Sequence, residues 1–331
     1  MNILIIRLSS FGDILLTTPL VRVLRKKYQN AKITYLTRKP FTAIFKNNPN
    51  IDLVIPYENS KHSQIKQELQ NNNYNIIIDL QNNLRSKRLI FGLNCKKYKY
   101  QKDNLRKFLL VKYKINLFNE KILSVAEKYI KSVENLKPDS KSLEFYPDKI
   151  EQKEDKTKKC IGICPGSKHF TKSWPIEYYV EISKILINKG YDVIVLGGKD
   201  DEAVAKEILN KVPQIIWGIT NNNLNELYWN MHNCDLIICN DSGLMHFACT
   251  LPNKKIIAIF GPTVKEFGFS PYNNPNAIVL ENNNIKCRPC THIGNKKCPK
   301  IHFKCMKDIQ PSYVLKKIEE MINGNSMENN L

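Results

Sequence analysis

The residues best placed to do chemistry lie in three polar turns, and each turn follows a short apolar run. The turns are residues 9–13 after 2–7, residues 165–168 after 160–164, and residues 240–246 after 235–239. A strand that turns into a helix in this way presents backbone N–H groups at the helix N-terminus, where the helix dipole favours an anion. Such turns predict an enzyme that holds a phosphorylated ligand.

The second and third turns carry side chains that bind phosphate oxygens, and we expect them to converge on one diphosphate. The candidates are Ser167, Lys168, Lys172, Asp241, Ser242, Gly243 and His246. Since Asp241 is negative, it is expected to order its loop by accepting N–H bonds. The alternatives are solvent-exposed lysines and an ordinary helix histidine.

Asp13, at the end of the first turn, has two uses that residue type and position leave open. Aspartate is among the best N-cap residues, and a helix is expected to begin here. A carboxylate at the end of a strand can also remove a proton from a hydroxyl group. From these two facts alone, capping is the commoner use.

Asp201 presents a similar choice. It follows the apolar run 192–196 and two glycines, within the acidic sequence Asp200-Asp201-Glu202. An acid after such a strand can hold ribose hydroxyls, and an acid at a helix start can cap the helix. Asp201 is our candidate for the ribose, although the sequence does not separate it from its two acidic neighbours.

Strand and helix patterns alternate along the chain. Runs rich in Ile, Leu and Val predict strands at 2–7, 32–36, 52–55, 75–79, 160–164, 192–196, 214–217, 235–239 and 255–260. Amphipathic patterns predict helices at 13–28, 121–136, 175–189, 200–211, 223–231, 244–250 and 312–322. The charged, proline-containing stretch at 137–159 predicts a linker.

This alternation is typical of parallel sheets covered by helices on both faces. The predicted fold class is α/β, with two Rossmann-like doubly wound domains that face a central cleft. The expected domains are residues 1–150, residues 151–310, and a C-terminal helix and tail at 311–331 that can pack back on the first domain. Ligands bind such sheets beyond the carboxyl ends of the strands, where all three polar turns fall.

The chain has a formal net charge of +20, and the positive charge is concentrated in its first half. Residues 1–158 hold 31 Lys and Arg against 15 Asp and Glu, whereas the remainder holds 20 against 16. The first half is therefore expected to meet an anionic partner. The densest basic stretch is 85–114. It is our candidate for binding the anionic partner, and the alternative is a lysine-rich surface that only faces solvent. Arg85 and Arg88 are its candidate contacts, because arginine can hold a carboxylate or phosphate with two hydrogen bonds.

No apolar run approaches the roughly 18 residues that cross a membrane, and the N-terminal residues do not resemble a signal peptide. We therefore expect a cytoplasmic protein. Ten cysteines in that compartment favour thiols or metal ligands over disulfides. The spacing of Cys287, Cys290, Cys298 and Cys305 predicts a structural zinc site, with reduced core thiols as the alternative.

Four motifs, in this order, resemble one family. Residues 7–19 resemble the N-terminal signature of the bacterial ADP-heptose:lipopolysaccharide heptosyltransferases, glycosyltransferase family nine. Residues 172–175, 241–246 and 260–263 resemble the donor domain of that family. The tail from Cys287 to Cys305 resembles that of the subgroup that adds the second heptose.

The resemblance implies a GT-B fold and an inverting transfer of heptose from ADP-heptose to the inner core of lipopolysaccharide, without a catalytic metal. It implies Asp13 as general base and Lys172 as a phosphate ligand. We place Ser10, Gly12, Arg85 and Arg88 on the acceptor side. The acceptor would be an acidic glycolipid, so we expect peripheral association with the inner face of the cytoplasmic membrane. We also expect a monomer.

Two other interpretations remain at this point. The same architecture would suit a transferase for another nucleotide sugar, or a nucleotide-sugar epimerase or hydrolase. The sequence does not separate these enzymes, because the residues that recognise the nucleotide base form no motif. The net positive charge of the chain would also suit a non-enzymatic protein that binds nucleic acid. No helix-turn-helix, RNA-recognition or zinc-finger pattern appears, however, so we expect no nucleic-acid partner.

Overall fold

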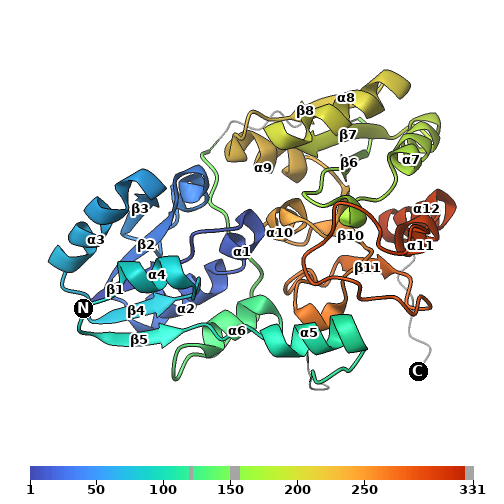
Figure 1. The fold of residues 1–331 in the computed structure, drawn as a ribbon. Helices are drawn as coiled ribbons and strands as arrows, with labels where there is room; N and C mark the ends of the chain where they lie inside the picture. The colour runs from blue at the N-terminus through green and yellow to red at the C-terminus, as the bar shows by residue number, and fades with distance from the viewer. Residues whose placement is uncertain (119–121, 150–156, 325–331) are drawn as a thin grey trace. The chain divides into compact units, whose positions relative to one another are not determined.

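The structure is a computed structural model that describes residues 1–118, 122–149 and 157–324. This part of the chain forms two compact units (Figure 1). The first comprises Met1–Asn104 and Leu123–Asp148, and the second comprises Leu105–Ile122 and Lys149–Leu331. Each is built on a parallel sheet flanked by helices, which confirms the α/β class. Part of the predicted linker, 150–156, and the end of the predicted tail, 325–331, lie outside the described residues.

The sheet of the first unit has the strand order β3-β2-β1-β4-β5, and its pairings are parallel. The strands are β1 (Asn2–Ile6), β2 (Lys32–Arg38), β3 (Leu53–Tyr57), β4 (Ile76–Asp79) and β5 (Lys96–Lys99). The central strand β1 is buried on both faces, with Leu4 and Ile6 on one side and Ile3 and Ile5 on the other. Such continuous apolar runs are what a doubly covered parallel strand requires.

Helices cover both faces of this sheet. They are α1 (Phe11–Leu15), α2 (Thr18–Lys27), α3 (His62–Asn71), α4 (Leu84–Leu89) and α6 (Val125–Lys131), with 3-10 turns at Lys39–Phe45 and Asn59–Lys61. The helix predicted over 13–28 is in fact two helices. The hydroxyls of Thr17 and Thr18 donate to the carbonyls of Ile14 and Leu15 at 2.6 and 2.8 Å, and Pro19 lies in the first turn of α2. These features end one helix and start another.

The sheet of the second unit has the order β11-β10-β9-β6-β7-β8, again with parallel pairings. Its strands are β6 (Cys160–Cys164), β7 (Asp192–Gly197), β8 (Ile216–Ile219), β9 (Leu236–Asn240), β10 (Lys255–Phe260) and β11 (Ala277–Glu281). The chain reverses its direction of travel across the sheet between β6 and β9. Ligands bind doubly wound sheets at such a switch point.

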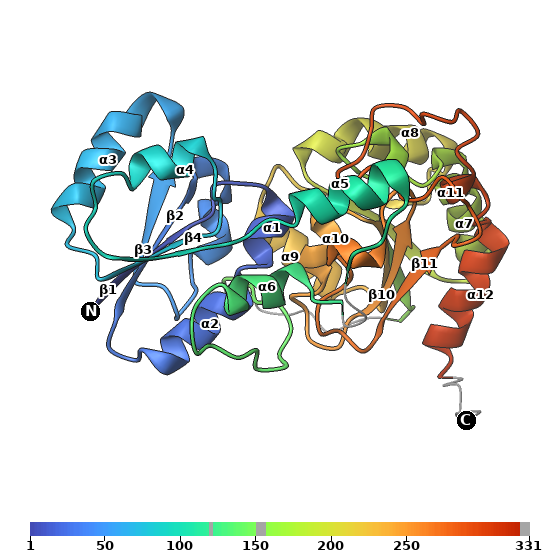
Figure 2. The same cartoon turned by 60° about the horizontal axis from the view of Figure 1, so that its bottom comes forward.

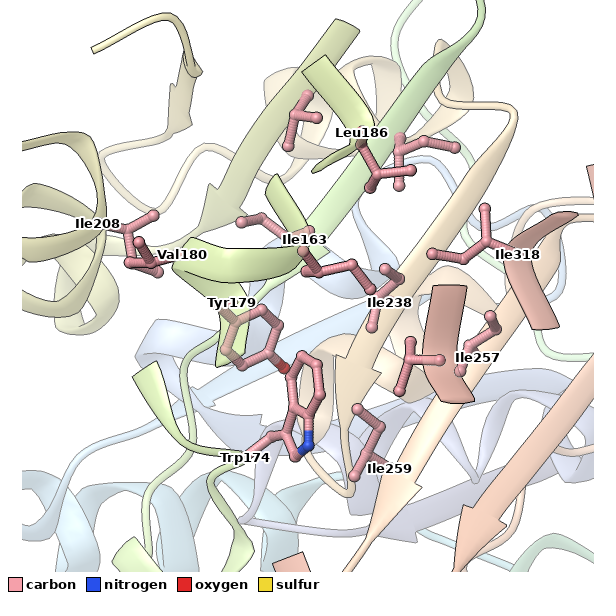
Figure 3. Close-up of a cluster of buried hydrophobic side chains, with 14 of the residues drawn as sticks. Ile163, Trp174, Tyr179, Val180, Leu186, Ile208, Ile238, Ile257, Ile259 and Ile318 are labelled. Atoms are coloured by element: carbon pink, nitrogen blue, oxygen red, sulfur yellow. The ribbon is translucent and has the colours of Figure 1, made fainter. Parts of the chain in front are cut away.

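The helices of this unit are α5 (Asn104–Tyr113), α7 (Ile176–Asn188), α8 (Glu202–Lys211), α9 (Leu224–His232), α10 (Gly243–Ala248), α11 (Lys304–Lys307) and α12 (Pro311–Ile322), with 3-10 turns at Phe170–Lys172, Lys199–Asp201 and Lys265–Phe267. Figure 3 shows the core, where Ile163, Ile238 and Ile257 of the strands lie with Leu186 of α7 and Ile318 of α12. None of the helices that the structure describes combines the length and apolar character needed to cross a bilayer.

Helix α12 packs on α7 within the second unit, because Val314 and Ile318 join that core. Packing of the C-terminal tail on the first domain stays a prediction. Residues 105–122 also belong to the second unit, although they precede the predicted boundary. Figure 2 shows the helix of this segment, α5, in front of the second unit.

Candidate active site

Asp13 lies just beyond the carboxyl end of β1, next to the point where strand order reverses in the first sheet. Ser10 is the N-cap residue of α1, and Asp13 is the third residue of that helix. The Asp13 carboxylate accepts hydrogen bonds from the Ser10 hydroxyl at 2.6 Å and from the Ser10 backbone N–H at 3.1 Å. Asp13 is therefore not the N-cap; it completes a capping box from inside the helix.

Arg7 holds the other oxygen of the Asp13 carboxylate. Its Nη2 lies 2.9 Å from Oδ1 of Asp13, with 9% of the Arg7 side chain and 20% of the Asp13 side chain exposed. Arg7 is itself anchored, since Nη1 donates to the backbone oxygen of Leu80 at 2.7 Å and the guanidinium lies 5.6 Å from the centre of the Tyr129 ring. Arg7 carries no local sequence signal of this role, because its partners Leu80 and Tyr129 are distant in sequence.

The electrostatics around Asp13 keep its carboxylate ionised. Burial alone would raise the pKa of Asp13, but the charge of Arg7 and the hydrogen bonds from Ser10 outweigh it, so the pKa is lowered. The side chain keeps one exposed portion through which a ligand can reach it. The Asp13 carboxylate is therefore ionised, oriented and open to accept a proton, while its lowered pKa makes it a weaker base than a free carboxylate.

The turn that carries Asp13 is held by the turn after β4. The side-chain oxygen of Gln81 accepts from the backbone N–H groups of Leu8 and Ser9 at 2.9 and 3.3 Å. Gly12 is buried within α1, and the Ser10 hydroxyl is engaged by Asp13. Acceptor contacts by Ser10 and Gly12 stay predictions.

Arg85 and Arg88 line a cavity of about 550 Å³ in the first unit. They lie one turn apart on α4, and Tyr57 at the end of β3 and His62 at the start of α3 line the same cavity. The Tyr57 hydroxyl and Nδ1 of His62 are 3.1 Å apart. The remaining lining residues are Asn59, Asn83 and Leu84. The structure thus brings together the two predicted arginines with polar groups that no sequence motif revealed.

In the second unit, Asn240 ties the turns after β6 and β9 together. Its side-chain amide donates to the backbone oxygen of Pro165 at 2.9 Å. Its side-chain oxygen accepts from the Trp174 backbone N–H at 2.9 Å and from the Tyr179 hydroxyl at 3.2 Å. Figure 3 shows Trp174 and Tyr179 next to each other in the core. Asn240 is fully buried, so both ends of the 165–174 loop are fixed.

Lys172 and Asp241 from two of the predicted phosphate turns form an ion pair at 2.6 Å, with 14% and 4% of their side chains exposed. The hydroxyl of Thr263, in the turn after β10, donates to the same carboxylate at 2.6 Å. Asp241 therefore orders its loop as predicted, but through an ammonium and a hydroxyl group in place of the expected N–H bonds. This arrangement joins the turns after β6, β9 and β10 at one edge of the second sheet.

The other predicted phosphate residues lie on the same turns. Ser167 is half-buried and Lys168 is exposed on the first of them. Ser242 is the N-cap of α10, Gly243 begins that helix, and His246 lies within it, only 4% exposed. The buried Ser242 hydroxyl has no hydrogen-bond partner among the residues that the structure describes. A buried hydroxyl of this kind is suited to a ligand atom.

Asp201 has a structural position in the turn after β7. Its carboxylate accepts from the Gly198 N–H at 3.0 Å, and burial raises its pKa. A Cβ on Gly166 would lie 1.8 Å from the Asp201 carboxylate, so the carboxylate fills the space that this glycine leaves. Glu202 pairs instead with Lys206 at 2.6 Å. Asp201 also occupies the N-cap position of α8, but its side chain makes no cap hydrogen bond there. Both the capping role and a ribose contact stay predictions.

The predicted zinc site is not supported by the arrangement of the tail. Within the described residues, no group of three or more His, Cys, Asp or Glu side chains could hold a metal ion. Cys305 is drawn into the hydrophobic core, where burial raises its pKa to about 12, while Cys287 lies with its sulfur 3.8 Å from Nε2 of His302. The charges of Cys287, Cys290 and Cys298 act on the Cys305 thiol, so the four cysteines lie near one another, but among the described residues they do not form a group that could hold a metal ion.

The segment from Cys287 to Cys305 instead braces the turns that carry the predicted phosphate residues. Nε and Nη2 of Arg288 donate to the backbone oxygens of Gly261 and Thr263 at 2.6 and 2.7 Å. The Asn295 N–H donates to the Thr171 hydroxyl at 2.8 Å, and the Thr171 N–H donates to the Asn295 carbonyl at 3.1 Å. The segment around the cysteines therefore supports two turns of the site.

Comparison with known proteins agrees with this architecture. Residues 62–301 match the family model described as glycosyltransferase family 9 (heptosyltransferase). The lipooligosaccharide heptosyltransferase 2 of Campylobacter jejuni is 27% identical over 319 residues, which is 94% of this chain and 96% of that protein.

Solved structures show the same fold. The Escherichia coli ADP-heptose lipopolysaccharide heptosyltransferase II matches with a TM-score of 0.74 at 22% identity, over 98% of this chain and 99% of the other. The Escherichia coli heptosyltransferase WaaC with ADP matches with a TM-score of 0.70 at 19% identity, over 97% of this chain and 100% of the other. The predicted GT-B type of fold is thereby confirmed.

Proposed function

This chain belongs to glycosyltransferase family 9, the heptosyltransferases, and on that premise we propose that it transfers heptose from ADP-heptose to the inner core of a lipopolysaccharide, with inversion at the anomeric carbon. The observation that carries the proposal is the Asp13 carboxylate, held by Arg7 and Ser10 with a lowered pKa. The similarity to a heptosyltransferase 2 and to a structure with ADP supports the choice of donor and acceptor.

In the proposed reaction Asp13 acts as general base. An acceptor hydroxyl attacks the anomeric carbon of heptose while the bond from that carbon to the diphosphate oxygen breaks. The hydroxyl proton passes to Asp13 as the new glycosidic bond forms. A single displacement of this kind inverts the anomeric configuration. Arg7 keeps the carboxylate oriented during the step.

The leaving ADP is stabilised by groups of the second unit. Lys172 supplies a cation, and its ion pair with Asp241, itself fixed by Thr263, determines where that ammonium points. Lys168, Ser167, His246 and the buried Ser242 hydroxyl surround the same edge of the sheet. We propose that these groups neutralise the diphosphate in place of a divalent cation, so that catalysis needs no metal.

The acceptor side is proposed to lie in the first unit. Arg85 and Arg88 face a cavity large enough for a sugar-sized anionic group, and two guanidinium groups can hold a carboxylate or phosphate bidentately. The proposed acceptor is a glycolipid, so the protein is proposed to work at the inner face of the cytoplasmic membrane. We propose that it does so as a monomer. Its basic first half would favour that anionic surface.

Calorimetric titration with ADP, UDP, GDP and ADP-heptose in the presence of a chelator tests the proposal. Selective binding of ADP and ADP-heptose is expected, followed by transfer of heptose when an inner-core acceptor is added. Selective binding of UDP or GDP would keep the fold and replace the donor. Transfer that stops with chelator and returns with a divalent cation would refute metal independence.

A further inference from the structure

Helix α5 exposes apolar side chains and buries a charged one. Lys107 is buried, only 9% exposed, and Leu110 is buried beside it, whereas Leu105 is 69% and Phe108 49% exposed. A helix in water normally does the opposite. The exposed apolar side of α5 therefore suggests contact with something other than water.

The same pattern continues after the helix. Tyr113 is 55%, Ile115 48% and Leu117 49% exposed. The ammonium of Lys112 lies 5.4 Å from the centre of the Phe108 ring and 5.2 Å from that of Tyr113. Residues 105–117 thus present a set of large apolar side chains with a cation between two aromatic rings; we name this set the α5 face (Leu105, Phe108, Lys112, Tyr113, Ile115 and Leu117).

The α5 face is held firmly on the second unit. Lys114 donates to the backbone oxygens of Cys287 and Pro289. The Lys107 ammonium lies 5.7 Å from the centre of the Phe269 ring, on the side of α5 opposite the exposed residues. Figure 2 shows α5 in front of the second unit. These anchors account for the inverted pattern, because they hold Lys107 and Lys114 against the second unit while Leu105, Phe108 and Lys112 lie on the other side.

The charge of the segment indicates the partner. Residues 105–117 contain four Lys and Arg and no Asp or Glu. An anionic bilayer surface suits both the positive charge and the exposed apolar side chains of this segment. Its headgroups attract cations, and its acyl boundary accepts Leu, Ile and aromatic side chains. A second copy of the chain would bring the same positive charge, and a nucleic acid would leave the aliphatic side chains in water.

We propose that the α5 face inserts into the headgroup region of an anionic membrane, with Lys112 reaching out to lipid phosphates from between its two rings. This inference deepens the peripheral-membrane part of the proposed function and rests on that part alone. It gives the second unit, which carries the nucleotide site, its own attachment to the membrane surface.

The test is co-sedimentation of the full-length protein with vesicles of phosphatidylethanolamine and phosphatidylglycerol, and with vesicles of phosphatidylcholine alone. The variant is Leu105→Ser/Phe108→Ser, and the matched control is Leu53→Ser/Tyr313→Ser, which changes two side chains that are 38% and 47% exposed elsewhere. Wild type and control should bind the anionic vesicles, and the variant should bind at least about tenfold more weakly. The replaced side chains are exposed, so ADP binding and melting temperature should not change.

Equal vesicle binding by variant and wild type overturns the inference, as does a wild type that no vesicle retains. Dimerisation of the wild type that the variant abolishes would likewise overturn it and assign the face to a second copy. Transfer to a deacylated, water-soluble acceptor separates this test from that of the proposed function. A variant that still transfers heptose to this soluble acceptor but no longer binds anionic vesicles supports the inference. If the wild type transfers no heptose, the proposed function is contradicted, while the vesicle-binding result still decides the inference.

Discussion

Replacement of Arg7 by Met tests how the structure prepares Asp13 for catalysis. The substitution keeps an unbranched side chain but removes the charge that lies 2.9 Å from the carboxylate. An exposed ion pair contributes at most about 1 kcal/mol, whereas breaking a buried pair costs about 3–5 kcal/mol. With 9% and 20% of the two side chains exposed, we expect a loss of about 2–3 kcal/mol in unfolding free energy near neutral pH.

The loss should depend on pH in a defined direction. Because the pKa of Asp13 is lowered in the folded protein, its interactions stabilise the fold above the ordinary carboxyl pKa of about 4. That stabilisation disappears as the pH falls through the lowered value. The difference in unfolding free energy between wild type and Arg7→Met should therefore be largest near neutrality and should shrink in acid.

Activity gives the sharper assay. Without Arg7, burial dominates and the pKa of Asp13 rises, so the acidic limb of the kcat profile should move to higher pH. Arg7→Lys, which keeps a charge, is the matched control and should move the limb less. Direct titration of the Asp13 carboxyl by NMR should show the same order. An acidic limb that stays in place in a folded Arg7→Met protein would refute this account of the site.

Three further substitutions and one alkylation experiment have expected outcomes. Asp13→Asn should lower kcat by about 10²–10⁴-fold with ADP affinity unchanged in calorimetry; wild-type turnover would rule out the base. Lys172→Ala should weaken ADP binding by about 10–100-fold, since it removes a charge-assisted contact, while the exposed control Lys184→Ala should not. Arg288→Met breaks the buried ion pair of Arg288 with Glu281 at 2.6 Å and should lower the unfolding free energy in urea by about 3–5 kcal/mol; a small change would mean that residues 287–305 do not brace the site. Cys305, with its pKa raised to about 12, should resist alkylation at mildly alkaline pH until the protein is denatured; rapid reaction in the folded state would contradict its burial.

The parts of the fold that the sequence predicts well are those set by local pattern. Strands β6 and β10 have the predicted bounds, because continuous apolar runs between polar turns leave few alternatives. Strand β5 was missed because its sequence Lys-Lys-Tyr-Lys forms a largely exposed edge, and only its pairing with β4 makes it a strand. The packing of α12 on α7 depends likewise on long-range contacts that no local pattern contains.

The candidate site likewise has features that the local sequence predicts and features that depend on long-range contacts. The turns that carry Asp13, Lys172 and Asp241 could be located from the alternation of strands and polar residues. The contacts that tune them could not, since Arg7 depends on Leu80 and Tyr129, far along the chain. The inverted exposure of α5 was equally hidden, because a helix of mixed Leu, Phe and Lys residues does not reveal which side will face the protein.

The most direct test of the central claim is mass spectrometry of an inner-core acceptor incubated with ADP-heptose, chelator and the purified protein, with Asp13→Asn in parallel and the anomeric configuration read by NMR. The account predicts that the wild type adds one heptose with inverted configuration, and that Asp13→Asn adds essentially none although it still binds ADP. Retention of configuration, or equal product from the two proteins, would contradict it.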